Sequence, residues 1–202
     1  MRPNDPRVDE IVALVVDRLK KQGAGGAVSA QAVAAALAGT APAVRVRRRG
    51  VFDDVDSAVA AARKAFEQYE QMPLAARYGI VRAMRDAALG ALEEMCQRAV
   101  AETRLGRVED KRLKNRAAIT KTPGPEWLEP VAASGDDGLM ITERAPYGVI
   151  AAITPCTNPT ETIINNGIGM VAGGNAVVFN THPLARETSA WYVSLLSDAI
   201  VA

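Results

Sequence analysis

Apolar residues near the amino terminus recur at helical spacing and predict an amphipathic helix over residues 6–21. Asp5 can cap this helix, Pro6 suits its first position, and Gly23 can end it. Its apolar stripe consists of Val8, Ile11, Val12, Val15 and Leu19. A helix of this length is marginal alone in water, so the stripe needs a surface, either on its own domain or on another protein.

Residues 22–43 are mostly Ala and Gly and contain no aromatic residue, which predicts a flexible tether. Within it, residues 30–38 can form a transient helix. A basic patch follows, made of Arg45, Arg47, Arg48 and Arg49. Such a patch either binds phosphate groups or forms a solvated surface. Because no aromatic residues are interleaved with these arginines, we expect a solvated surface.

The next part of the chain has the pattern of three helices. Asp53 or Asp54 can cap the first of them, which Pro73 ends. Apolar residues at helical spacing predict the second helix over residues 74–103. The third helix is predicted over residues 108–120, with Lys and Arg on its exposed sides, and Pro123, Gly124 and Pro125 end it.

Strand and helix patterns alternate in the last third of the chain. Near-continuous apolar runs predict buried parallel strands at 148–154 and 176–179. Helices over 160–172 and from 184 to the end follow them, and an alternating segment at 138–146 predicts a strand before them. The order strand, helix, strand, helix begins a doubly wound parallel sheet, so the fold class is α/β.

Ligands bind beyond the carboxyl ends of the strands in such sheets. The turns there are Thr154–Asn158 and Asn180–Pro183, and the second holds His182, the one histidine of the chain. A helix that begins at Pro159–Thr160 would point free N–H groups at this place, which favours an anionic group such as a phosphate. The glycine-rich dinucleotide fingerprint is absent after the first strand, so nucleotide binding rests on topology alone.

Charge and aromatic content both change near residue 50. Residues 1–50 hold nine Lys or Arg and four Asp or Glu, whereas residues 51–202 hold fifteen and nineteen. All nine aromatic residues lie at or after Phe52. These steps divide the chain into a helix (1–21), a tether with a basic patch (22–50) and a main body (51–202).

Composition excludes several classes of protein. A net charge of +1 over 202 residues argues against a general nucleic-acid binder. No apolar run reaches the roughly 18 residues of a membrane span, and no secretory signal pattern begins the chain. Cys96 and Cys156 make no disulfide framework, which fits a reducing cytosol, and Cys96 lies beside an apolar helix face as a core residue would. A single histidine excludes a multi-histidine metal site, and we expect no metal.

Several segments of the main body are similar to one family. They are G-R-V-E-D-K at 106–111, K-N at 114–115, T-P-G at 122–124, T-P-C-T-N-P-T at 154–160, I-I-N-N at 163–166, G-N-A-V-V-F at 174–179 and H-P at 182–183. From Phe52 to Ala202 the chain resembles the coenzyme-A-acylating aldehyde dehydrogenases. Within that family it is most similar to the propionaldehyde and acetaldehyde dehydrogenases of bacterial microcompartments.

The resemblance implies that the main body is the amino-terminal, incomplete part of an aldehyde dehydrogenase NAD-binding domain. In this family a cysteine thiolate attacks a short aldehyde, hydride passes to NAD, and the thioester is transferred to coenzyme A. The nucleophilic cysteine of the family lies beyond the last turn of this sequence. The helix over residues 6–21 with its tether resembles an encapsulation peptide, which implies a microcompartment shell protein as partner and the lumen of a cytoplasmic microcompartment as location.

The resemblance also implies roles for the two turns. Thr157 and Asn158 lie at the place where members of the family have the residue that faces the oxyanion of the reacting aldehyde. The usual lysine after the second strand is Asn180 here, which leaves open how the ribose hydroxyls are held. The residues expected to bind the NAD cofactor are Thr154, Pro155, Cys156, Thr157, Asn180, Thr181, His182 and Pro183.

Three interpretations remain open at this stage. In the first, the chain is part of an NAD-dependent enzyme that forms homo-oligomers, and it is inactive alone because neither Cys96 nor Cys156 lies in the nucleophile's place. In the others it is a non-catalytic cargo module or an inert fragment. Cys156 lies in the turn before a helix, a place that favours the thiolate form of a cysteine, so it is an alternative candidate nucleophile that alkylation can test. Exposed apolar faces of residues 148–202 predict poor stability alone, or association with itself or a partner.

Overall fold

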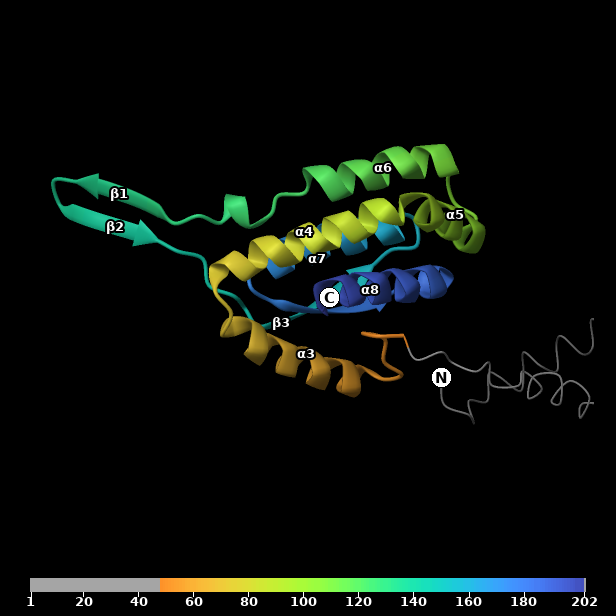
Figure 1. The fold of residues 1–202 in the computed structure, drawn as a ribbon, viewed down its shortest axis with the longest axis horizontal. Helices are drawn as coiled ribbons and strands as arrows, with labels where there is room; N and C mark the ends of the chain where they lie inside the picture. Colours follow the sequence, from red (N-terminus) through yellow and green to blue (C-terminus); the bar gives the residue numbers. More distant parts are fainter. Residues whose placement is uncertain (1–47, 202) are drawn as a thin grey trace, which may run out of the picture. The chain divides into compact units, whose positions relative to one another are not determined.

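The computed structural model describes residues 48–201, so the helix expected over residues 6–21 and the tether expected over residues 22–43 lie outside the described residues. The described residues belong to one unit that begins at Arg47. Helices form most of this unit, together with two small sheets (Figure 1). No helix among residues 48–201 is both long and apolar enough to cross a membrane.

Two of the predicted helices have nearly the predicted bounds. α3 (Val55–Glu70) is capped by the later of the two candidate aspartates, Asp54. The Asp54 carboxylate accepts hydrogen bonds from the backbone N–H of Ser57 at 2.7 Å and from its hydroxyl at 2.8 Å. These bonds hold the pKa of Asp54 below its ordinary value. α6 (Val108–Lys121) likewise confirms the helix predicted over 108–120.

The single helix predicted over residues 74–103 is wrong in one respect, because the structure has two helices there. α4 (Leu74–Gly90) and α5 (Leu92–Thr103) meet at Ala91, whose backbone leaves the helical region at φ −99° and ψ 9°. Gly90 lies directly before the break and is a weak helix former. The bend allows the apolar faces of both helices to reach one core.

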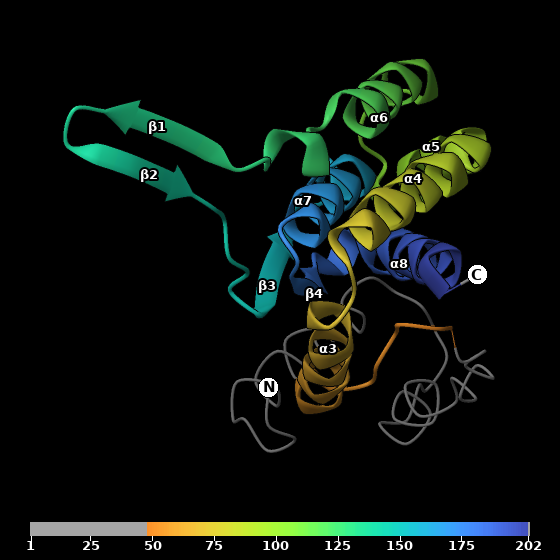
Figure 2. The same ribbon diagram turned by 60° about the vertical axis from the view of Figure 1, so that its left-hand side comes forward.

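The strand predicted over 138–146 is shorter in the structure and has a partner that the sequence pattern did not reveal. β1 (Val131–Gly135) and β2 (Gly138–Thr142) pair antiparallel across a two-residue turn. The last pair of the ladder is Val131 with Thr142, and the next residue of the partner strand would be Pro130, which has no backbone N–H to continue the ladder. Both strands are exposed along their whole length, and the hairpin extends away from the helices in both views (Figures 1 and 2).

The predicted order of strand, helix, strand and helix is confirmed. β3 (Val149–Thr154) pairs parallel with β4 (Ala176–Thr181), and α7 (Pro159–Ala172) connects them. A short 3-10 turn then leads into α8 (Arg186–Val201). The described residues thus contain a mixed α/β fold with one parallel strand pair.

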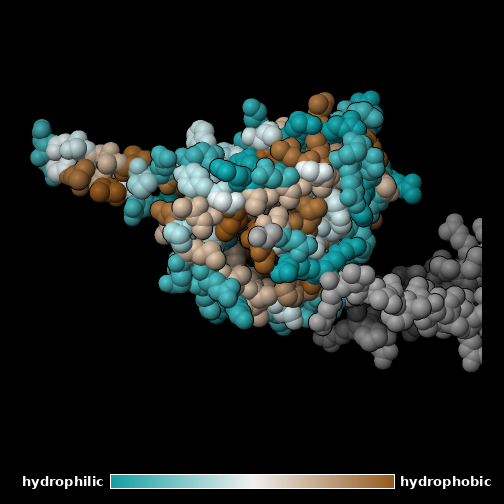
Figure 3. Space-filling model, in the orientation of Figure 1, coloured by the Kyte–Doolittle hydropathy of each residue, from teal (hydrophilic) through white to brown (hydrophobic). Residues whose placement is uncertain are grey.

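Burial of β3 differs from the expectation of a fully buried strand. Ala152 and Thr154 are buried, but Ile153 between them is 80% exposed. The described elements leave the side chain of Ile153 uncovered, so a continuous apolar run is here combined with one exposed face of the strand. Apolar side chains are also exposed on the hairpin, where Figure 3 shows them as a brown area.

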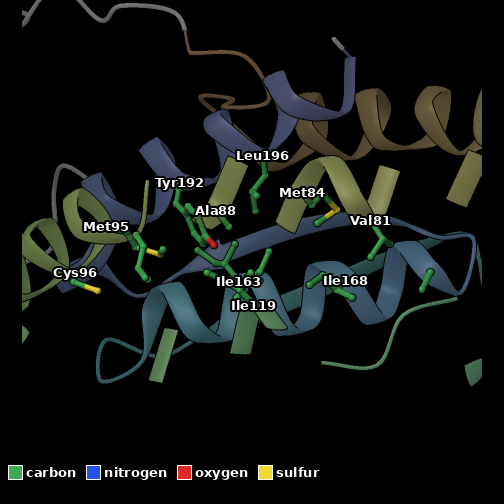
Figure 4. Close-up of a cluster of buried hydrophobic side chains, with 13 residues drawn as sticks. Val81, Met84, Ala88, Met95, Cys96, Ile119, Ile163, Ile168, Tyr192 and Leu196 are labelled. Carbon is green, nitrogen blue, oxygen red and sulfur yellow. The ribbon is translucent and has the colours of Figure 1, made fainter. Parts of the chain in front are cut away.

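The core forms where α7 packs between the other helices. Figure 4 shows side chains from α4, α5, α6, α7 and α8 gathered there. Its largest fully buried members are Tyr192, Met95, Ile119, Ile163, Ile164 and Ile168. Cys96 is fully buried in the same cluster, which confirms the prediction that it is a core residue.

Two arginines of the basic patch form ion pairs at the surface. A guanidinium nitrogen of Arg48 lies 3.3 Å from a carboxylate oxygen of Glu187, and one of Arg49 lies 2.9 Å from a carboxylate oxygen of Asp198. Both acidic partners belong to α8, far away in the sequence. The side chains of Arg48 and Arg49 are 34% and 58% exposed, so these ion pairs lie on a solvated surface beside α8.

The turn between α7 and β4 also fixes the start of β3. Gly174 has φ +83°, a backbone conformation that favours glycine. Next to it, the side-chain oxygen of Asn175 accepts hydrogen bonds from the backbone N–H groups of Tyr147 at 2.6 Å and Gly148 at 3.0 Å. Its side-chain nitrogen donates to the carbonyl oxygen of Met170 at 3.0 Å. One buried amide therefore joins three segments.

Candidate functional site

The structure brings the two predicted turns together at the carboxyl ends of the strands. Thr154 and Thr181 are register partners, and the backbone N–H of His182 donates to the carbonyl oxygen of Thr154 at 3.2 Å. Thr154 is 2% exposed, and its hydroxyl has no hydrogen-bond partner within the described part of the chain. An unpaired buried hydroxyl at a strand end suits a group that accepts or donates a hydrogen bond there.

Two lysines of α6 hold the first turn. The Lys111 ammonium donates to the carbonyl oxygen of Thr157 at 2.5 Å, and the Lys114 ammonium donates to the side-chain oxygen of Asn158. Thr157 is exposed and Asn158 is half-buried. Neither lysine was singled out as a site residue from the sequence. The signal that could have found them was their place in the 106–115 segment that resembles the acylating family.

Charged and polar groups are buried directly beneath this turn. The Lys111 ammonium lies 3.4 Å from a carboxylate oxygen of Glu161, and both side chains are at most 10% exposed. The Thr160 hydroxyl donates to the other oxygen of Glu161 at 3.1 Å. Glu161 is in the first turn of α7, so this helix start already carries a carboxylate. That negative charge reduces its attraction for the phosphate expected there.

The same carboxylate affects two neighbours in the core. Burial, and then the negative charge of Glu161, raise the pKa of the Cys96 thiol. Burial and Glu161 also raise the pKa of the Tyr192 hydroxyl. A thiol with a raised pKa in a closed core is a poor nucleophile. Cys156, in contrast, is half-buried in the turn itself.

The second turn is held from α5. The ring nitrogen Nδ1 of His182 accepts a hydrogen bond from the backbone N–H of Leu184 at 3.1 Å. The carboxylate of Glu102 accepts from the backbone N–H groups of Glu187 at 2.9 Å and Thr188 at 2.7 Å. A carboxylate at a helix start stabilises the helix, so Glu102 anchors the beginning of α8 beside the turn. Asn180 and Pro183 are exposed.

One apolar cavity among the described residues is separate from the two turns. It has a volume of about 720 Å³ and is lined by apolar side chains of α3, α4, α7, β4 and α8, among them Tyr69, Phe179 and Val193. None of the residues 154–158 or 180–183 lines it. In residues 48–201, no group of three or more His, Cys, Asp or Glu could hold a metal ion.

Comparison with known proteins assigns the chain to a family. The family model described as the aldehyde dehydrogenase family matches residues 41–201. The chain belongs to the aldehyde dehydrogenase family. Its relatives place the chain in the coenzyme-A-acylating group of that family. A propanal dehydrogenase (CoA-propanoylating) of Citrobacter freundii is 44% identical over 159 residues, which are 78% of this chain and 34% of the relative.

Solved structures agree with this family assignment. A crystal structure of Rhodopseudomonas palustris propionaldehyde dehydrogenase with bound propionyl-CoA is 49% identical, with a TM-score of 0.73 over 75% of this chain and 34% of that chain. A propionaldehyde dehydrogenase from the Clostridium phytofermentans fucose utilisation bacterial microcompartment is 48% identical, with a TM-score of 0.71 over 74% and 34%. The chain spans about a third of the length of the curated relatives it matches.

Proposed function

We propose that this chain forms the NAD-binding side of an enzyme that oxidises a short aldehyde, propionaldehyde or acetaldehyde, to the coenzyme A thioester. The paired strand ends at Thr154 and Thr181 carry this proposal, in a chain 49% identical to a propionaldehyde dehydrogenase that binds propionyl-CoA. Ligands of open α/β sheets bind at this edge.

The turn residues would hold NAD, which accepts the hydride when bound. The unpaired Thr154 hydroxyl fits such a ligand, because a buried polar atom is expected to have a partner. Asn180 stands where the family has lysine, so the ribose would be held by a neutral amide. The proposed cofactor-binding residues are Thr154, Pro155, Cys156, Thr157, Asn180, Thr181, His182 and Pro183.

Thr157 and Asn158 would stabilise the oxyanion of the reacting aldehyde. An oxyanion site needs hydrogen-bond donors that are already oriented. The Lys114 ammonium occupies the side-chain oxygen of Asn158, which leaves the two N–H donors of the amide to face a carbonyl oxygen. The hydroxyl of exposed Thr157 offers another donor.

Neither cysteine of this chain would supply the nucleophilic thiolate. Cys96 is enclosed in the core and has a raised pKa. Cys156 lies among the residues proposed to hold NAD. We therefore expect no turnover from these 202 residues alone.

An assay of NAD reduction at 340 nm with propionaldehyde and coenzyme A tests the proposal. The chain alone should give no NADH, whereas the chain mixed with a carboxyl-terminal fragment of the Citrobacter freundii relative should give NADH. Thr157→Ala combined with Asn158→Ala should lower the rate in the mixture about a hundredfold, as loss of oxyanion donors does. Turnover by the chain alone, or an unchanged rate in this double variant, would contradict the proposal.

A second proposal concerns where the enzyme works. Residues 6–21 would dock on a microcompartment shell protein, and the hairpin would contact another copy of the chain in a homo-oligomer. Similarity to a dehydrogenase from a bacterial microcompartment favours the first part, and the exposed apolar residues Leu139 and Ile141 of the hairpin favour the second.

Deletion of residues 1–21 tests the docking proposal. The shortened chain should lose co-localisation with shell proteins in cells that produce both, because the apolar stripe is removed. Substitution of Asp9 and Glu10 by Ala, off the stripe, is the matched control and should leave co-localisation unchanged. If the shortened chain still co-localises, docking through this segment is wrong.

A further inference from the structure

Lys111 is an unusual residue to find enclosed. It is 4% exposed, whereas lysine is almost never fully buried unless its charge is paired. Its ammonium reaches two partners, the carbonyl oxygen of Thr157 at 2.5 Å and a carboxylate oxygen of Glu161 at 3.4 Å. Both partners lie at the start of α7, so this one side chain ties α6 to the turn after β3.

A second contact from α6 reaches the neighbouring residue. Lys114, three positions along the helix and therefore on the same side, donates to the side chain of Asn158. Two successive residues of the turn are thus held from one helix, one through its backbone and one through its side chain.

Stability alone is a weak reason for this ion pair. Removing two charges from water costs about as much as their attraction returns, so a buried pair is often no better than apolar residues of the same size. What the pair adds is geometry, because it allows the ammonium only a small range of positions. From such a position the second interaction of the ammonium, its hydrogen bond to the carbonyl oxygen of Thr157, orients the turn.

We propose that Lys111, fixed by Glu161, is a positioning residue that sets the conformation of the Thr157–Asn158 turn, with Lys114 as the second point of attachment. The importance of this turn for catalysis rests on the proposed function above. The positioning itself concerns only the chain's own residues, so it is tested without aldehyde, NAD or coenzyme A.

The two cysteines provide a built-in measurement. Cys156 is half-buried and directly precedes Thr157, so its alkylation rate reports the order of the turn. Cys96 is fully exposed only when the core opens, because it is 0% exposed in the folded chain. Pulse alkylation of the 202-residue chain with iodoacetamide, followed by mass spectrometry of each cysteine peptide, therefore separates local from global opening.

Lys111→Met should raise the alkylation rate of Cys156 about fivefold or more while Cys96 stays protected, since one charge-assisted hydrogen bond to the turn is lost. Lys111→Arg keeps a cation with N–H donors and should restore most of the protection. Lys121→Met, an exposed position in the same helix, is the matched control and should leave both rates unchanged.

Lys111→Met also leaves the Glu161 carboxylate buried without its cation, which can open the whole core. The double variant Lys111→Met with Glu161→Gln removes that charge, and it should protect Cys96 as well as the unsubstituted chain does while Cys156 still reacts faster. If Cys156 reacts at the unsubstituted rate in this double variant, or accelerates only together with Cys96 in every variant, the pair is a core ion pair and the positioning role is wrong. The aldehyde assay can fail independently of either result.

Discussion

Ile163→Ala is expected to lower the free energy of unfolding by about 3 to 4 kcal/mol, because it removes fully buried methyl groups and leaves a cavity that packed neighbours cannot fill. Ile163 is 0% exposed in α7, and Figure 4 shows it between Ile119 of α6 and Tyr192 of α8. This helix also carries the proposed turn at its start. Chemical denaturation followed by circular dichroism measures the change.

The matched control is Ile153→Ala, the same substitution in the neighbouring strand. Ile153 is 80% exposed, so the change should stay below about 1 kcal/mol. Equal losses at the two positions would mean that the sheet face around Ile153 is covered in solution, by another copy of the chain or by a partner. That outcome would contradict the burial difference on which this prediction rests.

Asn175→Ala should be nearly as costly, with a loss of about 3 kcal/mol. The amide oxygen accepts hydrogen bonds from the N–H groups of Tyr147 and Gly148, and the amide nitrogen donates one to the carbonyl oxygen of Met170. A buried donor left without an acceptor costs about 1 to 3 kcal/mol, and the substitution leaves more than one polar group unpaired. Denaturant titration gives the loss, and hydrogen exchange shows where it acts.

The exchange measurement makes this prediction specific. The amides of Tyr147 and Gly148 should exchange faster in Asn175→Ala, because they are the donors that lose their acceptor. Asn180→Ala, at an exposed position of β4, should change stability by less than about 0.5 kcal/mol and leave both amides protected. Unchanged exchange at these two amides in Asn175→Ala would show that another group satisfies them.

The order of the elements was accessible from the sequence because it depends on local patterns. Apolar runs, capping residues and prolines predicted α3, α6, α7 and α8 and both strands of the parallel pair. Turn residues at the strand ends predicted where the two turns meet, since parallel strands place their carboxyl ends at one edge. The resemblance of the motifs predicted the acylating family.

Features that depend on distant partners were not accessible. The break at Ala91 brings two helix faces to one core, and β1 is recognisable only from its pairing with β2. Arg48 and Arg49 gain acidic partners from α8 more than a hundred residues away. For the two ion pairs the deciding contact joins segments that no local pattern relates, whereas Gly90 before the break and the two-residue turn after β1 are local signals that the periodicity alone did not reveal.

The sequence by itself determined the fold class, the family and the place of the candidate site, because periodicity, turn residues and motifs are properties of neighbouring positions. Only the tertiary structure decided which side chains hold that site. Lys111 on α6 is an ordinary charged residue in a helical pattern, and its role follows from the packing of α6 against α7. That packing encloses its ammonium with the Glu161 carboxylate and the carbonyl oxygen of Thr157, where an unpaired charge would be too costly to bury.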